Sequence, residues 1–174
     1  TRLKVLSKMN FPMSVIPSYV IFSQAYVHLV MMFIAFVILM WNGHMPSIYT
    51  LQLIYFMFGL YCLIVSISLI TSTLSTMVRD LHILLNSILR MMLYVSGVLW
   101  PITIIADFPT IMKLMMLNPV YYLIEGYRAA FFTTDWYFIT NWEYSLYFWG
   151  LVIVLFLIGA ALHVKFRRHL IDYL

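Results

Sequence analysis

The sequence predicts an all-α integral membrane protein, a helical bundle of about four transmembrane segments with re-entrant helices on the extracellular side. Three observations predict this class. Of the 174 residues, 64% are hydrophobic and only 9% are charged; the mean hydropathy is +0.98; and no charged residue occurs from Met9 to Val78. A soluble domain carries about 25% charged residues. The composition therefore excludes a soluble enzyme, a disulfide scaffold and a nucleic-acid-binding module.

Four apolar segments are predicted to enter the membrane, because a spanning helix needs about 20 mostly apolar residues to cross about 30 Å of hydrocarbon. The turn from Asn42 to Ser47, with its Gly and Pro, separates the first segment from the second. The third segment is the shortest and contains Gly97 and Pro101, and at 1.5 Å per residue it reaches only about 24 Å. The four segments are residues 20–41, 51–73, 91–106 and 144–164.

Positive charge sets the predicted orientation. Eight of the ten basic residues lie in residues 1–10, 79–90 and 165–174, and basic residues favour the cytoplasmic side. Four crossings place all three regions on that side, so the C-terminal tail, 165–174, is expected in the cytoplasm. The connection 107–143 then faces outward. It is too apolar for an ordinary loop, and irregular backbone at membrane depth needs protein or water around it, so re-entrant helices are expected there.

Two helices outside the main spans are also predicted. Residues 79–90 place Arg79, His82 and Arg90 on one helical face and leucines on another, a pattern typical of an interfacial amphipathic helix. A second helix should begin at Asn118-Pro119, because Asn is a preferred N-cap and Pro suits the first helical position.

Hydroxyl side chains are concentrated near the end of the second predicted span, where seven lie between Ser66 and Thr76. Small hydroxyl residues let helices approach closely in lipid and return their hydrogen bond to the preceding turn. Close helix packing is the preferred interpretation, and a polar lining for a transport pathway is the alternative. The seven are Ser66, Ser68, Thr71, Ser72, Thr73, Ser75 and Thr76.

No catalytic or cofactor-binding motif is visible. The chain has no Gly-rich phosphate loop, so it is not expected to bind ATP in the P-loop manner. Its histidines lack metal-ligand spacing, and its single cysteine, Cys62, has no partner for a disulfide. We expect no metal site and no enzymatic activity of the chain by itself. His28, deep in the first span, is interpreted as a hydrogen-bonded group between helices, with a proton relay as the alternative.

Aromatic residues are dense between Trp100 and Trp149. Trp and Tyr favour the headgroup level, so an interfacial belt is one interpretation; a stacking track for a sugar polymer is the other. On a helix that starts at Pro119, the pair Glu125 and Arg128 can form an ion pair. This pair shares a face with Tyr121 and Phe132, whereas Tyr122 lies about 100° away. The candidate pathway residues are Trp100, Tyr121, Tyr122, Glu125, Arg128, Phe131 and Phe132.

Several stretches resemble a known family: LKVLSKMNFPMSVIPS at the start, Arg79-Asp80, SGVLWPI, and LNPVYYLIEGYR. Together they resemble type-2 ATP-binding-cassette exporter permeases. Within these, the chain is most similar to the teichoic acid translocation permeases of Gram-positive bacteria, which are related to O-antigen polysaccharide exporters. YSLYFWG and HVKFRRHLIDYL support this narrower similarity, which covers essentially the whole chain.

The resemblance implies a homodimer of six-span permeases with two copies of a cytoplasmic ATPase subunit that uses ATP and Mg²⁺. The four segments would be the last four of six, so we expect an N-terminally truncated domain over 1–174 that does not transport alone. Residues 1–12 would form a cytoplasmic coupling region. The expected ATPase contacts are Lys8, Phe11, Pro12, Arg79 and Asp80.

The implied function is ATP-driven export of a lipid-linked glycopolymer, with wall teichoic acid as the leading substrate, across the plasma membrane of a Gram-positive bacterium. Membrane lipids are expected partners and nucleic acid is not. The nearest alternatives are export of an O-antigen-like or capsular polysaccharide, a drug or a lipid. A transferase acting on polyprenyl carriers would need acidic or metal-binding clusters at a membrane face, and Asp107 and Asp135 are too isolated for this. An ion channel or a proton-coupled carrier would need charged residues within the spans, and the full spans contain none.

Overall fold

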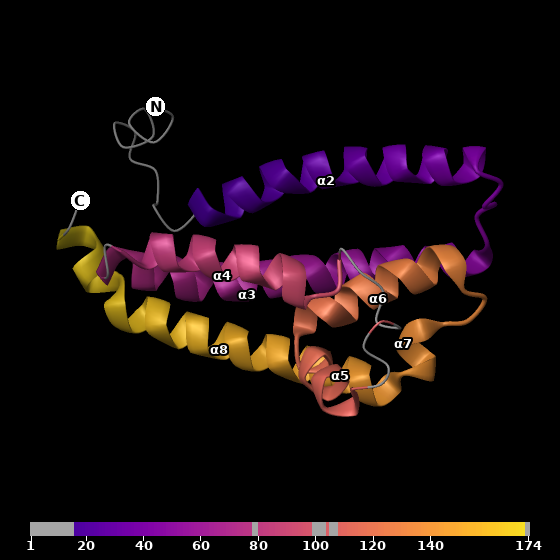
Figure 1. The fold of residues 1–174 in the computed structure, drawn as a ribbon. Helices are drawn as coiled ribbons and strands as arrows, with labels where there is room; N and C mark the ends of the chain where they lie inside the picture. Colours follow the sequence, from indigo (N-terminus) through magenta and orange to yellow (C-terminus); the bar gives the residue numbers. More distant parts are fainter. Residues whose placement is uncertain (1–15, 78–79, 99–103, 105–107, 173–174) are drawn as a thin grey trace. The chain divides into compact units, whose positions relative to one another are not determined.

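The computed structural model describes residues 16–77, 80–98, 104 and 108–172, and these residues form helices, turns and irregular segments with no strand (Figure 1). The predicted all-α membrane fold is confirmed. The chain divides into two units, residues 1–42 and 43–174, which are described separately. The helices are α2 (Ile16–Trp41), η2 (Ile48–Leu51), α3 (Gln52–Met77), α4 (Leu81–Val95), α5 (Pro109–Met116), α6 (Pro119–Phe132), α7 (Tyr137–Thr140) and α8 (Trp142–Asp172).

The described part of the first unit is the single helix α2 and its C-terminal cap. Residues Tyr19–Trp41 of α2 are long and apolar enough to cross a membrane, in agreement with the predicted segment 20–41. Asn42 follows the last helical residue, and its backbone N–H and side-chain amide both donate to the Ile38 carbonyl, at 3.1 and 2.8 Å. His28 lies half-buried on α2, and its two interpretations stay predictions.

The second unit contains the other two helices that are long and apolar enough to span a bilayer. One candidate span is Ile48–Ser75, which includes most of α3, and the other is Trp142–Lys165 of α8. They correspond to the predicted segments 51–73 and 144–164. With α2, these make three candidate spans among the described residues. The chain is therefore a multi-pass membrane protein.

The third predicted segment, 91–106, differs from the expectation of one apolar helix. Helix α4 begins at Leu81, ten residues earlier, and ends at Val95. Ser96 caps it and Gly97 follows in the left-handed region at φ +69°, which is the usual way for a glycine to terminate a helix. The predicted amphipathic helix over 79–90 is thus the first part of α4. Because the structure describes only Ile104 between 99 and 107, a crossing by this segment stays a prediction.

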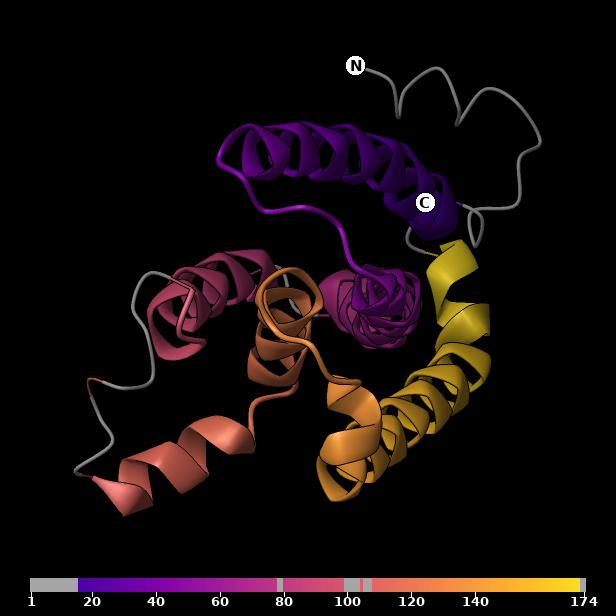
Figure 2. The same ribbon diagram turned by 90° about the vertical axis from the view of Figure 1, so that its right-hand side faces the viewer.

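Helices α3 and α8 lie side by side, and α6 packs against the N-terminal half of α3 (Figure 2). Glycines allow these close approaches. A Cβ atom at Gly159 of α8 would lie 2.8 Å from the Leu69 Cβ of α3, and one at Gly126 of α6 would overlap the Phe56 ring. The buried core that the helices share consists of Phe56, Leu63, Tyr122, Leu123, Phe148 and Val152.

Four of the hydroxyl side chains near the end of α3, those of Ser66, Thr71, Ser72 and Thr73, make hydrogen bonds within the protein. Ser66, only 1% exposed, donates to the Cys62 carbonyl at 2.8 Å and reaches the Val152 carbonyl of α8 at 3.4 Å. Thr73 is fully buried and donates to the Leu69 carbonyl at 3.0 Å. These bonds return to the preceding turn or join α3 to α8, which favours the packing interpretation over a polar pathway.

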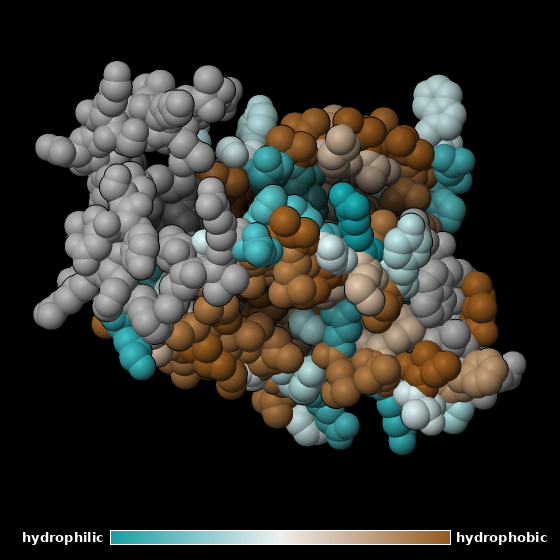
Figure 3. All heavy atoms as spheres, turned by 60° about the vertical axis from the view of Figure 1, so that its left-hand side comes forward, coloured by the Kyte–Doolittle hydropathy of each residue, from teal (hydrophilic) through white to brown (hydrophobic). Residues whose placement is uncertain are grey.

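Hydrophobic side chains cover much of the face seen in Figure 3. On α3, Ile64 and Ile67 are at least 37% exposed, and on α8, Ile153 and Leu157 are at least 55% exposed. An apolar surface of this extent marks an interaction with lipid or protein. It is the surface that a bilayer requires of its spanning helices.

Candidate functional site

Helix α6 carries most of the candidate site residues, and its start follows the predicted pattern. The Asn118 side-chain oxygen accepts from the Val120 N–H at 3.0 Å, and Pro119 occupies the first turn. This confirms the N-cap predicted from the sequence. At the other end, the Thr133 hydroxyl donates to the Ala129 carbonyl at 2.9 Å. Both ends of this 14-residue helix are therefore capped by side chains, which satisfies backbone groups that the helix leaves open.

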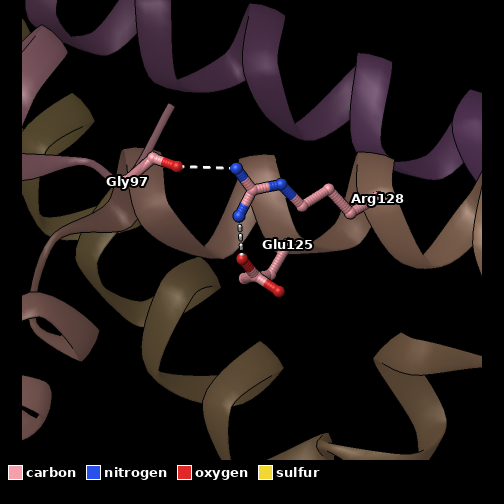
Figure 4. A network of polar contacts seen from close by, with 3 residues as sticks. All are labelled: Gly97, Glu125 and Arg128. Carbon is pink, nitrogen blue, oxygen red and sulfur yellow. Dashed lines mark hydrogen bonds and ion pairs between the residues drawn. The ribbon is translucent and has the colours of Figure 1, made fainter. Parts of the chain in front are cut away.

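The charged residues of α6 form a three-part contact with the turn after α4 (Figure 4). Arg128 donates from Nη1 to Glu125 Oε1 at 2.7 Å and from Nη2 to the Gly97 carbonyl at 2.7 Å. The Arg128 and Glu125 side chains are 34% and 22% exposed. The ion pair predicted from their spacing is confirmed. The Gly97 carbonyl, 31 residues away in the sequence, is a partner that helical spacing could not reveal.

Tyr121 lies beside this contact and is only 3% exposed. A Cβ atom at Gly97 would lie 3.5 Å from the Tyr121 ring and 3.5 Å from the Met115 methyl group. Burial, with a further contribution from the charge of Glu125 and an opposing one from Arg128, raises the pKa of Tyr121 to about 12.

Tyr122 has a different position, as its 100° offset predicted, but it lies in the core and not at a surface. The side chain is fully buried and stacks on Phe148 with ring centroids 4.7 Å apart. Its hydroxyl lies 2.7 Å from Ser145 Oγ of α8 and 3.4 Å from the Tyr55 hydroxyl of α3. Ser145 itself donates to the Phe138 carbonyl at 2.9 Å, so Tyr122 is the donor to Ser145. Tyr122 thus holds α6 to α3 and α8.

Of the remaining candidates, the structure describes Phe131, Phe132 and Asp80, and the others lie outside the described residues. At the end of α6, Phe131 is half-buried and Phe132 is 60% exposed. The Phe132 ring meets His44 edge-on at 5.5 Å. Asp80 is exposed and precedes α4, where its carbonyl accepts from the Ile83 N–H at 3.1 Å. The candidates outside the described residues are Lys8, Phe11, Pro12, Arg79 and Trp100.

Tyr122, Tyr137 and Phe138 of the outward connection join aromatic side chains of α3 and α8 in an internal cluster, which neither the belt nor the track interpretation anticipated. Tyr55 of α3 stacks on Phe138 at 4.6 Å, and its hydroxyl accepts from Trp149 Nε1 at 2.6 Å. The partners come from α3, α6, α7 and α8, so no local spacing could reveal the cluster. Its rings are Tyr55, Phe56, Tyr122, Tyr137, Phe138, Tyr144, Phe148 and Trp149.

Gln52 is a structural residue that the sequence interpretation missed. Its side chain is 1% exposed, donates to the Asp135 carbonyl at 3.2 Å and accepts from the Tyr137 N–H at 3.1 Å. These two bonds fasten the connection between α6 and α7 to the start of α3. The available signal was a single glutamine within the apolar segment 51–73, since a buried amide needs partners.

The long apolar helices and the helical connection between α4 and α8 define a multi-pass membrane protein with a non-spanning helix pair, α5 and α6. In the part of the chain that the structure describes, no group of three or more His, Cys, Asp or Glu residues could hold a metal ion.

Residues 4–132 match the family described as ABC-2 type transporter. Since the match covers well over half of the chain, the protein belongs to this family. It is a transmembrane permease component of an ABC transporter, and members of the family generally work with an ABC ATPase. The match includes α2 to α6 and ends at Phe132, the last residue of α6. No curated protein matches the sequence.

Proposed function

We propose that the protein is the permease subunit of an ATP-driven exporter that moves a lipid-linked glycopolymer, wall teichoic acid in the first place, across the plasma membrane. The family match over residues 4–132 supports the exporter class. The polymer is supported by the sequence resemblance and by one observation on α6: the guanidinium of Arg128 and the exposed ring of Phe132 lie four residues apart on one helical face.

This face suits the chemistry of such a polymer. A sugar or polyol presents flat apolar faces that pack on an aromatic ring, and the phosphates of teichoic acid are anions that a guanidinium attracts. Glu125 on the same face keeps the local net charge near zero, so the polymer would not be held tightly. A pathway needs such weak, repeated contacts, because a tightly bound segment could not advance.

Energy for transport would come from two copies of a separate cytoplasmic ATPase, which uses ATP and Mg²⁺, acting on a homodimer of the permease. We assign its contacts to residues 1–12 and to Arg79-Asp80, the basic regions that the positive-inside rule places in the cytoplasm together with the C-terminus. Asp80 is exposed at the start of α4, as such a contact requires. The chain itself would bind no cofactor.

Export of a lipid or a hydrophobic drug is the second candidate, and one observation favours it. An apolar groove of about 340 Å³ lies between α3 and α8. Its polar groups are already used, since Ser66 bonds the Cys62 carbonyl and Trp149 bonds Tyr55. A hydrocarbon chain would fit such a lining. The residues around the groove are Tyr61, Cys62, Val65, Ser66, Trp149, Val152, Ile153 and Phe156.

ATP hydrolysis by the reconstituted complex separates the two candidates. The permease in its full natural length, assembled with its ATPase in proteoliposomes, is given a polyprenyl-linked teichoic acid polymer, polyprenyl phosphate alone, or a hydrophobic cationic drug. We expect the linked polymer to stimulate hydrolysis several-fold and the other two to have little effect. If the drug or polyprenyl phosphate stimulates hydrolysis and the linked polymer does not, glycopolymer export is wrong and export of a lipid or a hydrophobic drug is the function.

A further inference from the structure

Helix α4 is exposed along its length and buried only where it ends. None of its residues from Leu81 to Val95 is buried, and the exposed residues include charged, polar and apolar ones. The next residue, Ser96, is 1% exposed, and Gly97 is also buried. Besides the contacts that α4 makes with α3, the turn that follows it is therefore the buried part of its attachment to the second unit.

At this turn a side chain of α6 donates a charged hydrogen bond to the backbone. Arg128 Nη2 donates to the Gly97 carbonyl at 2.7 Å (Figure 4), and a hydrogen bond from a charged donor is about twice as strong as a neutral one. The left-handed conformation of Gly97, at φ +69°, ends α4 and sets the direction in which this carbonyl points.

Two neighbours fix the geometry of the guanidinium. Glu125 accepts from Nη1 at 2.7 Å, and because the guanidinium is planar and rigid, this bond directs Nη2 to the Gly97 carbonyl. Tyr121 and Met115 pack against Gly97 and are 3% and 4% exposed. Their side chains keep the contact out of water on one side, which strengthens the hydrogen bond.

We propose that Arg128 is a positioning residue that clamps the end of α4 to α6, so that these two helices move as one body during the transport cycle. A displacement at the Asp80 end of α4 would then reach α6 directly, through the bond between Arg128 and the Gly97 carbonyl. On this account Nη1 and Nη2 of Arg128 both bind groups of the protein itself: Nη2 holds the Gly97 carbonyl, and Nη1 binds Glu125, which aligns the guanidinium. Only the role of Asp80 as the receiving end rests on the proposed function; the clamp does not depend on the substrate.

The test compares hydrogen exchange in α4 and α6 of the full permease–ATPase complex in nanodiscs, without nucleotide and after trapping with ATP and vanadate. In the wild type, we expect exchange in peptides covering 88–98 and 119–132 to change together on trapping. Arg128→Lys keeps the charge but cannot make the two bonds of the fork. We expect it to speed exchange at residues 92–98 about tenfold, as loss of a charge-assisted bond implies, and to abolish the response of α6 while that of α4 remains.

Arg90→Lys is the matched control, because Arg90 lies on the exposed surface of α4 and the change in chemistry is the same; both responses should persist. Gly97→Ala strains the left-handed turn but keeps the carbonyl, so it should lower stability and leave the two responses coupled. Glu125→Gln, which keeps an acceptor oxygen, should give an intermediate loss. If Arg128→Lys leaves the responses of α4 and α6 coupled as in the wild type, the clamp is wrong. A coupled response together with weaker stimulation by polymer would overturn the clamp and leave Arg128 with only the polymer contact of the proposed function.

Discussion

Helix α6 is held in two different ways on its two sides. Toward α3 and α8 it presents three buried residues, Tyr122, Leu123 and Gly126. Tyr122 and Leu123 pack in the shared core, and Gly126 lies against the Phe56 ring. Toward the turn after α4 it presents Arg128, which is 34% exposed and donates one hydrogen bond to the Gly97 carbonyl and one to Glu125 of α6 itself. The first side is held by close packing of buried side chains, and the second by hydrogen bonds of one partly exposed side chain.

The two sides of α6 differ in how easily their contacts can be broken when the protein changes conformation. Aromatic packing involves many contacts that must be broken together, since a close-packed interior tolerates little deformation. Two hydrogen bonds from one guanidinium can be exchanged singly for bonds to water or to another acceptor. We therefore expect α6 to stay with α3 and α8 in every single variant, and its coupling to α4 to be the contact that one substitution at Arg128 releases. The following predictions test this contrast in order of decreasing effect.

Tyr122→Ala should be the most damaging change to stability. It removes a fully buried ring and leaves a cavity next to Phe148, which costs about 3–5 kcal/mol for an aromatic residue. Phe132→Ala on the same helix, at 60% exposure, should change stability by less than about 0.5 kcal/mol. Detergent-resistance or thermal-unfolding midpoints of the purified complex measure both. Similar midpoints for the two variants would mean that α6 is not anchored through Tyr122.

Gly126→Ala should follow, with a cost of about 1–3 kcal/mol from overpacking, because the added methyl group would overlap the buried Phe56 ring. Gly150→Ala in α8 is the control, since a Cβ atom there meets nothing within 4 Å; it should be neutral or slightly stabilising, as alanine is the better helix former. The same unfolding assay applies. A neutral Gly126→Ala would show that α3 and α6 pack less closely than the structure indicates.

The charged pair should behave differently from an isolated one. For two partly buried charges alone, removal of both costs less than removal of one. Here the Gly97 carbonyl also loses its donor when Arg128 is replaced, so the double variant Glu125→Gln/Arg128→Gln should export no better than Arg128→Gln. Export by complexes present at equal levels is the measurement. Recovery in the double variant would show that the ion pair alone matters and that the bond to Gly97 does not.

Tyr147→Phe should give the smallest effect. The Tyr147 hydroxyl donates to the Leu117 carbonyl at 2.8 Å, joining α8 to the turn between α5 and α6, but the residue is 37% exposed. Water can replace much of a bond at such a site, so we expect a loss of about 0.5–1 kcal/mol, measured as a small shift of the unfolding midpoint. A loss as large as that of Gly126→Ala would place this turn in the anchored part of the molecule.

Features that depend on neighbours in the sequence could be predicted. Long apolar runs gave α2, α3 and α8; Asn118-Pro119 gave the start of α6; and the spacing of Glu125 and Arg128 gave their ion pair. A segment of suitable composition adopts a helix largely from local preferences.

Features that depend on distant contacts could not be predicted. The Gly97 carbonyl is not a side chain, so no residue type signals that it will accept from Arg128. The burial of Tyr122 depends on Tyr55 and Phe148 from two other helices, and an aromatic residue in a membrane protein suits the interface and the interior equally well. The end of α4 at Val95 had a local signal in Gly97, but a glycine within an apolar run is also tolerated in membrane helices.

The central proposal is that the face of α6 with Arg128 and Phe132 lies along the export path of a glycopolymer. Polymer export by cells depleted of their own permease tests it most directly, with Phe132→Leu compared with Phe58→Leu at equal levels of complex. The two rings are matched at 60% and 61% exposure, but Phe58 lies on the spanning helix α3. We expect Phe132→Leu to lower export a few-fold, because an aromatic contact contributes about 0.5–1.5 kcal/mol, and Phe58→Leu to export like the wild type. Equal export by the wild type and both variants would contradict the proposal and leave Phe132 as a membrane-facing ring.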